Sequence, residues 1–233
     1  MTYENNITNL SLNKRLSLLR EGRLSAREIA DAVADFGSEN FVEAKADVER
    51  LLDHGDEIVR YNAISTLAYE WGTTDRPERV VEMVLNDPDV DCRRNAASAL
   101  GSLFRSSNDS KILEILANVV LDPAQEDQVR CSAYAALLDV LGVPKQHQPD
   151  TFSLKLDAQV DWILVEQCRQ THDPVSLQEL AERLIARTAP RDILEDMVKN
   201  VREVKNLIKQ TQDMAQQSPN REPDSGDLSK KAD

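Results

Sequence analysis

The stretch VRYNAISTL at residues 59–67 returns twice further along the chain, as CRRNAASAL at 92–100 and as VRCSAYAAL at 129–137. A shift of 33 positions superposes the first copy on the second, and a further 37 positions superposes the second on the third. The arginine, the alanine and the closing leucine are kept, whereas the letters between them change. A period of this length is typical of stacked structural repeats, and it therefore decides the fold before any other feature.

Each copy follows a second apolar stretch that ends in a turn. These stretches are VERLLDHGDE (48–57), VVEMVLNDPD (80–89) and ILANVVLDPAQED (115–127). Glycine and proline at the turns stop one helix. Asp56, Asp89 and either Glu126 or Asp127 then stand where an acidic residue caps the next helix. The repeating unit is predicted to be a helical hairpin.

On a helical wheel of about 100° per residue, the repeated letters share one stripe. Alanine occupies the middle of this stripe in every copy, at Ala63, Ala96 and Ala133. A single hairpin cannot bury such a stripe, but the next hairpin can, and small alanine lets two helices approach closely. We expect these residues to form the seam between successive hairpins.

Composition favours helices throughout. The chain of 233 residues is 41% hydrophobic, which is enough to bury a core, but only 4% aromatic. We predict an all-α fold, an α-α superhelix of about five hairpins. Its predicted parts are capping helices at 1–38, three repeats at 39–142, helices that complete or cap the array at 157–215, and a disordered tail at 216–233.

Signals outside the repeats refine this picture. Ser25 followed by Glu28 is the signature of a capping box, and Gly37 is placed as the stop of that helix. Residues 143–156 are expected to form a loop, the stretch SLQELAERLIART (176–188) an amphipathic helix, and residues 191–215 a last helix.

The apolar helix, the Asp-Pro-Asp-like turn and the pattern Val-Arg-x-x-Ala-x-x-x-Leu resemble the HEAT repeat, in the short form of bacterial HEAT-like proteins that include the bilin lyase subunits of phycobilisome biogenesis. The resemblance covers about 40–142; the third turn is longer than usual, and Cys92 replaces a valine. It implies that the second helix of each hairpin lines the concave side of a solenoid. It also implies that the recurring arginines reach an aspartate in a turn instead of an anionic ligand. These arginines are Arg60, Arg93 and Arg130, with Asp53, Asp87 and Asp122 as candidate partners.

Familiar catalytic arrangements do not occur in the sequence. His54, His147 and His172 have no spacing that places two ligands on one helix face. There is no GxSxG, no GxGxxG and no CxxC pair. We therefore predict no catalytic residue, no cofactor and no metal site.

Net charge and hydropathy limit the classes of partner that the chain is expected to bind. The net charge is -13, and residues 37–143 carry 20 acidic against 10 basic side chains. Such a surface disfavours nucleic acid, whose affinity depends on lysine and arginine. No stretch approaches the roughly 20 apolar residues of a membrane helix, and no signal segment is recognisable. We expect a cytoplasmic protein that binds neither nucleic acid nor membrane.

The wheel positions opposite the seam are not needed for stacking, so their identity points either to a binding surface or to plain solvent exposure. We predict that they bind a partner, with aromatic and arginine side chains as anchors. The predicted partner-binding residues are Tyr61, Asn62, Ser65, Tyr69, Arg94, Asn95, Ser98, Ser132 and Asp139.

These observations favour a non-enzymatic adaptor that binds another protein, with a basic patch on that protein as the complement of the acidic repeats. Two alternatives remain at this level. The resemblance implies a bilin lyase-like subunit that holds a tetrapyrrole, and the acidity fits an immunity protein that neutralises a basic toxin. The sequence leaves the oligomeric state open.

Overall fold

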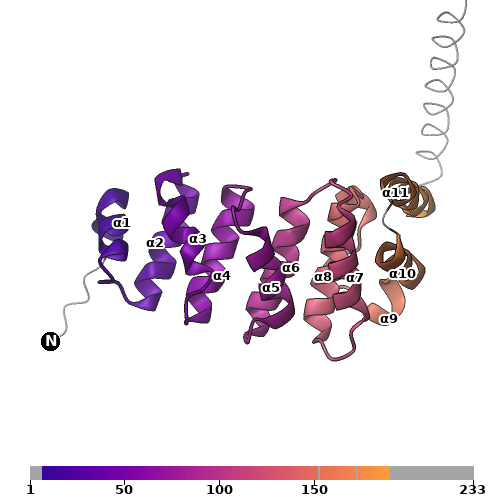
Figure 1. The fold of residues 1–233 in the computed structure, drawn as a ribbon, viewed down its shortest axis with the longest axis horizontal. Helices are drawn as coiled ribbons and strands as arrows, with labels where there is room; N and C mark the ends of the chain where they lie inside the picture. The colour runs from indigo at the N-terminus through magenta and orange to yellow at the C-terminus, as the bar shows by residue number, and fades with distance from the viewer. Residues whose placement is uncertain (1–6, 152, 172, 189–233) are drawn as a thin grey trace, which may run out of the picture. The chain divides into compact units, whose positions relative to one another are not determined.

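The computed structural model describes residues 7–151, 153–171 and 173–188, and every regular element in these ranges is helical (Figure 1). The α-helices are α1 (Leu12–Arg20), α2 (Ala26–Ser38), α3 (Lys45–Leu51), α4 (Glu57–Ser65), α5 (Pro77–Asn86), α6 (Val90–Leu103), α7 (Ser110–Leu121), α8 (Asp127–Val140), α9 (Leu156–Gln159), α10 (Trp162–Gln170) and α11 (Pro174–Thr188). A π-helical segment, η3 (Thr66–Glu70), continues α4. The predicted all-α class is confirmed.

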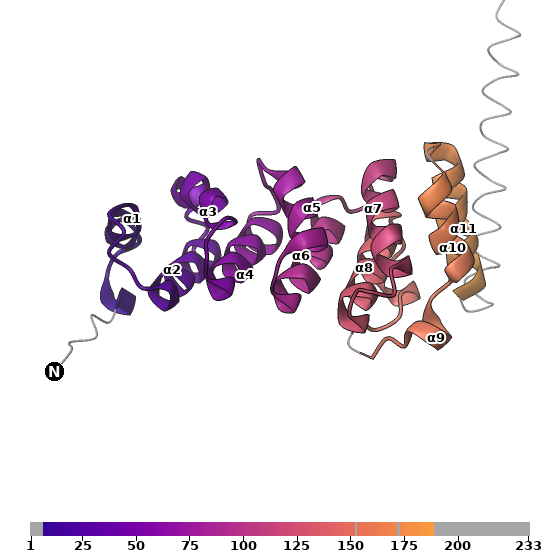
Figure 2. The ribbon, with the colours of Figure 1, turned by 60° about the horizontal axis from the view of Figure 1, so that its bottom comes forward.

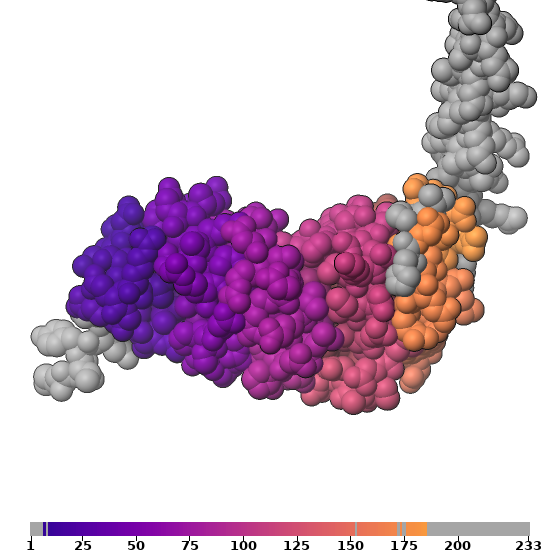
Figure 3. Space-filling model, in the orientation of Figure 1, coloured from indigo at the N-terminus to yellow at the C-terminus, as the bar shows by residue number. Residues whose placement is uncertain are grey.

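The helices are arranged in two rows, which Figures 1 and 2 show from different sides. In the first row α2, α4, α6 and α8 pack one against the next. In the second row α3, α5 and α7 each pack on the helix that follows them in sequence, and α10 packs on α7. The space-filling view shows the hairpins following one another in chain order along the surface (Figure 3). The repeats therefore stack as neighbours, as predicted.

The alanines predicted for the seam lie in the hydrophobic core. Ala63 on α4, Ala96 on α6 and Ala133 on α8 are all completely buried. The closing leucines of the three copies, Leu67 and Leu100 among them, are buried with them in the same hydrophobic cluster. The repeated alanines and leucines are thus core residues, and the seam that they were expected to form stays a prediction.

Gly101 lies where α6 meets α8. A Cβ atom at this position would lie 2.7 Å from the Cα of Ala136 and 2.9 Å from its Cβ. The backbones of α6 and α8 therefore approach each other so closely that only glycine fits. The wheel treats each helix alone and does not register how close two helices come.

The helix starts follow the predicted caps, with one exception. Asp56 accepts a hydrogen bond from the Ile58 backbone N–H at 3.0 Å, and Asp89 accepts one from Cys92 at 2.9 Å. Ser25 and Glu28 form the predicted capping box. Glu126 is the N-cap residue of α8, but its side chain makes no capping bond and pairs with Arg93 instead.

The prediction that Gly37 ends its helix is wrong. α2 runs to Ser38, and Gly37 is buried inside it. A Cβ atom at Gly37 would lie 2.8 Å from Glu70 Cγ and 3.1 Å from Thr66 Cγ2. Glycine serves close packing here, and a positive φ of 49° occurs only later, at Asn40.

Beyond the repeats the chain continues as helices. The predicted loop at 143–156 contains a short 3-10 turn (Lys145–His147) and ends where α9 begins. The predicted amphipathic helix is α11, and its Leu177, Leu180 and Ala181 are buried. Helices α1 to α11 belong to one compact unit. The predictions of a last helix at 191–215 and a disordered tail at 216–233 lie outside the described residues, and the other predicted boundaries stay predictions.

Candidate functional site

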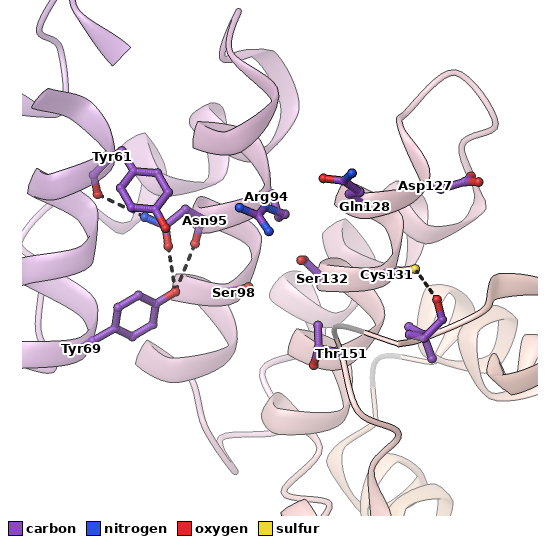
Figure 4. A pocket seen from close by; sticks show the side chains of 11 residues that line it. Tyr61, Tyr69, Arg94, Asn95, Ser98, Asp127, Gln128, Cys131, Ser132 and Thr151 are labelled. Atoms are coloured by element: carbon purple, nitrogen blue, oxygen red, sulfur yellow. Dashed lines mark hydrogen bonds between the residues drawn. The ribbon is translucent and has the colours of Figure 1, made fainter. Parts of the chain in front are cut away.

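A groove of about 570 Å³ crosses α4, α6 and α8. The second helices of three hairpins supply one wall and the floor, and the loop after α8 supplies the far end (Figure 4). We call the following set the groove residues: Tyr61, Tyr69, Arg94, Asn95, Ser98, Asp127, Gln128, Cys131, Ser132, Thr151 and Leu154.

Six of the nine residues chosen from the sequence line this groove. They are Tyr61, Tyr69, Arg94, Asn95, Ser98 and Ser132. They come together because copies of the same wheel position lie side by side when the hairpins stack. Whether they bind a partner stays a prediction.

The other three residues chosen from the sequence do not line the groove. Asn62 donates its amide to the Ile58 carbonyl of its own helix at 2.8 Å. Ser65 donates to the Tyr61 carbonyl at 2.9 Å and supports the groove from below. Asp139 is only 7% exposed.

The Asp139 carboxylate is held by hydrogen bonds within the protein. Its carboxylate accepts hydrogen bonds from Arg105 at 3.0 Å, from Lys145 at 2.8 Å and from Gln148 at 2.9 Å. These bonds tie the loop after α8 to the helix and to the end of α6. The wheel position is free on an isolated helix, but here the loop folds back over it, so we leave Asp139 out of the proposed site.

Asn95 organises the tyrosine end of the groove. Its side-chain amide donates to the Tyr61 carbonyl at 3.1 Å and to Ser65 Oγ at 2.9 Å, and its Oδ1 accepts from the Tyr69 hydroxyl at 3.0 Å. Figure 4 shows the two tyrosine rings on one side of Asn95. The Tyr69 hydroxyl is held by Asn95, and Tyr61 and Tyr69 keep 37% and 46% of their surface exposed, so both remain available for contact.

Tyr69 lies within the π-helical segment. The Trp71 N–H donates to the Thr66 carbonyl at 3.0 Å, five residues back instead of four. Within this segment Ala68 is buried while Tyr69 is exposed. Segments of this kind frequently occur at functional sites. No sequence pattern indicated this turn.

Arg94 lies near the centre of the groove. One guanidinium nitrogen pairs with the Asp91 carboxylate one turn earlier on α6, at 3.0 Å. Its Nε is buried, and within the described part of the chain no group accepts a hydrogen bond from it. Arg94 is the only lysine or arginine among the groove residues.

The far end of the groove was not predicted from the sequence. Asp127 and Gln128 come from the first turn of α8, and Thr151 and Leu154 come from the loop. Cys131 occupies the free row of α8 and its thiol donates to the Leu154 carbonyl at 3.6 Å. The repeat period could have indicated Gln128 and Cys131, whereas nothing in the sequence indicates where the loop returns.

The recurring arginines bind within the stack. Arg60 pairs with Asp87 through two hydrogen bonds of 2.8 Å, as the resemblance implied. Arg93 donates hydrogen bonds to the Asp87 carbonyl at 2.6 Å and to the Glu126 carboxylate at 2.6 Å. Arg130 uses the Val120 carbonyl at 2.9 Å, with its guanidinium 5.9 Å from the Trp162 ring centre. Of these three arginines, only Arg60 forms an arginine–aspartate pair between hairpins.

Burial changes the acidity of the cysteines. It raises the pKa of Cys92 and of Cys168 to about 12, and it also raises the pKa of Cys131. Tyr69 as a whole is 46% exposed, but desolvation of its hydroxyl, which bonds to Asn95, raises its pKa to about 12. These groups stay neutral at physiological pH, so the thiols behave as packing groups.

We expect the free energy of unfolding to fall as the pH rises above 9, because the folded thiols hold their protons more tightly than the unfolded thiols, whose pKa is 9.0. Each thiol contributes a slope of up to about 1.4 kcal/mol per pH unit. Urea unfolding between pH 7 and 10.5 measures this slope. Cys168→Ala should flatten it, and an unchanged slope in that variant would contradict the assignment.

The described ranges contain no group of three or more His, Cys, Asp or Glu side chains placed to hold a metal ion. No helix within them is long and apolar enough to cross a membrane.

Comparison with known proteins identifies the repeats. No curated protein and no solved structure matches the chain. A family model described as HEAT repeats matches residues 44–138, which span α3 to α8 and most of the groove-bearing helices. The match coincides with the repeat period and with the stacked hairpins, so residues 44–138 are an array of HEAT repeats.

Proposed function

We propose that the chain is a non-enzymatic adaptor that binds a segment of a partner protein in the groove across α4, α6 and α8. HEAT repeats typically mediate protein–protein interaction and are generally non-catalytic. The observation that carries the proposal is the convergence of two half-exposed tyrosines and an arginine from different hairpins on one groove. Tyrosine and arginine are the side chains that most often anchor interfaces.

The groove is preorganised for such binding. Asn95 fixes the backbone of α4 and the Tyr69 hydroxyl through three hydrogen bonds, so the tyrosines lose little freedom when a partner contacts them. Stacked helices also present this surface without a mobile loop on the tyrosine side. Binding therefore demands little rearrangement of the chain.

The acidic repeats favour a partner with a basic patch. Residues 37–143 carry twice as many acidic as basic side chains, 20 against 10. Complementary charge speeds the encounter more than it tightens the complex. We expect the association rate to fall several-fold between 50 and 300 mM salt, while the dissociation rate changes little.

Ser98→Trp is expected to abolish partner binding. Ser98 is half-buried on α6 and lines the groove, so an indole fills the groove without opening a cavity in the core. A partner is first captured with a photo-crosslinking residue in place of Gln128, identified by mass spectrometry and purified. Its affinity for the variant should then fall at least about 30-fold, equivalent to about 2 kcal/mol.

The matched control is Glu82→Trp. Glu82 is 60% exposed on α5, in the other row of helices. Both variants should keep the helical circular dichroism and melting temperature of the unchanged protein. Equal affinity of the partner for Ser98→Trp and Glu82→Trp would refute the groove as the binding site.

A further inference from the structure

The groove contains one cationic group in a neutral polar setting. Around Arg94 lie Tyr69, Ser98 and Gln128, and Figure 4 shows the guanidinium facing the space between α6 and α8. The only acidic groove residue is Asp127. Its side chain is 81% exposed and pairs with Arg130 at 3.3 Å, so it belongs to the rim. Arg94 is therefore the one positively charged side chain among the groove residues, although the chain as a whole is acidic.

Arg94 has hydrogen-bonding capacity left over. A guanidinium carries five N–H donors in a fixed plane. The structure uses one terminal nitrogen for Asp91, whose side chain is 59% exposed and one helical turn away, and the Nε is buried, so the terminal nitrogens are the part of the guanidinium that is open to a ligand. Exposed pairs of this type contribute little and exchange readily. A ligand with two acceptor oxygens can accept hydrogen bonds from these terminal nitrogens.

A carboxylate fits this position better than the other side chains of a peptide. Arginine binds carboxylates through two parallel hydrogen bonds, and the Ser98 and Ser132 hydroxyls line the same groove as additional donors. Lysine or arginine from a partner would meet the charge of Arg94 in a partly desolvated site.

We infer that the partner segment inserts an aspartate or glutamate side chain that pairs with Arg94, with a neighbouring apolar side chain against Tyr61 and Tyr69. This inference rests on the proposed function and adds the chemistry of its anchor. It is compatible with a partner that is basic overall, because screening limits each exposed charge to about 8 Å at physiological salt. The acidic side chains of the repeats attract the basic surface of the partner, whereas Arg94 pairs with a single acidic residue of the partner inside the groove.

A peptide library tests the anchor directly. Phage displaying random 12-residue peptides are selected on the full chain and counter-selected on Ser98→Trp, whose groove is filled. The peptides that survive both steps depend on the groove. We expect them to share an aspartate or glutamate at one position, one or two residues from an apolar residue.

The affinities of synthetic copies of the selected peptides then measure the interaction between Arg94 and the shared acidic residue. Arg94→Gln should weaken the selected peptides at least tenfold, and replacing the shared acid with its amide should weaken them by a similar factor. Combining both changes should cost little more than either alone, because they remove the same interaction. The control is Arg50→Gln, the same change of charge on α3, where the side chain is 77% exposed. It should leave affinity unchanged.

The outcomes separate the two proposals. Groove-dependent peptides without a shared acid, or with binding unaffected by Arg94→Gln, overturn the anchor and leave the proposed function standing. Peptides that share a lysine or arginine instead also overturn it. Failure to select any groove-dependent peptide counts against both proposals.

Discussion

Replacing Asp87 with alanine is expected to lower the free energy of unfolding by about 3–5 kcal/mol. The Asp87 carboxylate is buried and receives two hydrogen bonds of 2.8 Å from Arg60, which is buried as well. In the variant the guanidinium cannot escape by losing its proton, because arginine stays protonated in proteins. Without Asp87, Arg60 keeps only the carbonyls of His54 and Gly55, and a buried charge stays unneutralised.

Urea unfolding followed by circular dichroism measures this loss, as a lower midpoint at an unchanged slope. The matched control is Asp53→Ala. Asp53 also pairs with arginines of the next hairpin, Arg76 and Arg79, but its side chain is half exposed, so its loss should cost less than about 1 kcal/mol. The double variant Arg60→Met with Asp87→Leu should recover most of the stability, since neither charge is then buried alone. A cost for Asp87→Ala no larger than that for Asp53→Ala would contradict this account.

Gly101→Val is expected to destabilise the chain by about 3 kcal/mol, at the upper end of the usual cost of overpacking. Its first side-chain atom would lie 2.7 Å from the Cα of Ala136, and backbone cannot move aside as a flexible side chain can. α6 and α8 must separate along their whole contact. Since α6 and α8 carry Arg94, Asn95, Ser98 and Ser132, the groove should widen and partner affinity should fall with stability.

The alanine variants sharpen this test. In a helix interior, glycine to alanine normally adds about 1 kcal/mol of stability. Gly101→Ala should nevertheless destabilise. Gly37→Ala is the matched control, because the nearest atom there is Glu70 Cγ, which belongs to an exposed and flexible side chain. Thermal unfolding of both variants decides the matter, and a Gly101→Ala variant as stable as Gly37→Ala would show that the two helices can separate at little cost.

Local sequence patterns predicted the structure correctly for residues whose role depends only on their own hairpin and the next one. The burial of the repeated alanines, the caps at Asp56 and Asp89 and the capping box at Ser25 are of this kind. They could be predicted because a repeated position meets the same neighbour in every copy. The candidate row on the second helices followed from the same reasoning, and most of it lines the groove.

The errors arose where distant or unrepeated segments meet. Asp139 seemed free on a wheel, but the loop carrying Lys145 and Gln148 covers it. Gly37 was predicted to stop its helix, but it lies inside α2, and both Gly37 and Gly101 mark close contacts with a neighbouring helix. The π-helical turn before Trp71 has no repeated counterpart. Such features depend on a contact that occurs once in the molecule, so no periodicity encodes them.

The sequence by itself determined the stack of hairpins and the helix face that stacking does not use, because the same pattern of core positions occurs in all three repeats. Only the tertiary structure decided that this face is a groove, that Thr151 and Leu154 close its far end, and that Arg94 stands in it with donors to spare. The reason is physical. Burial of a repeated stripe requires only the neighbouring hairpin, whereas the depth and charge of a groove depend on how several elements meet in space.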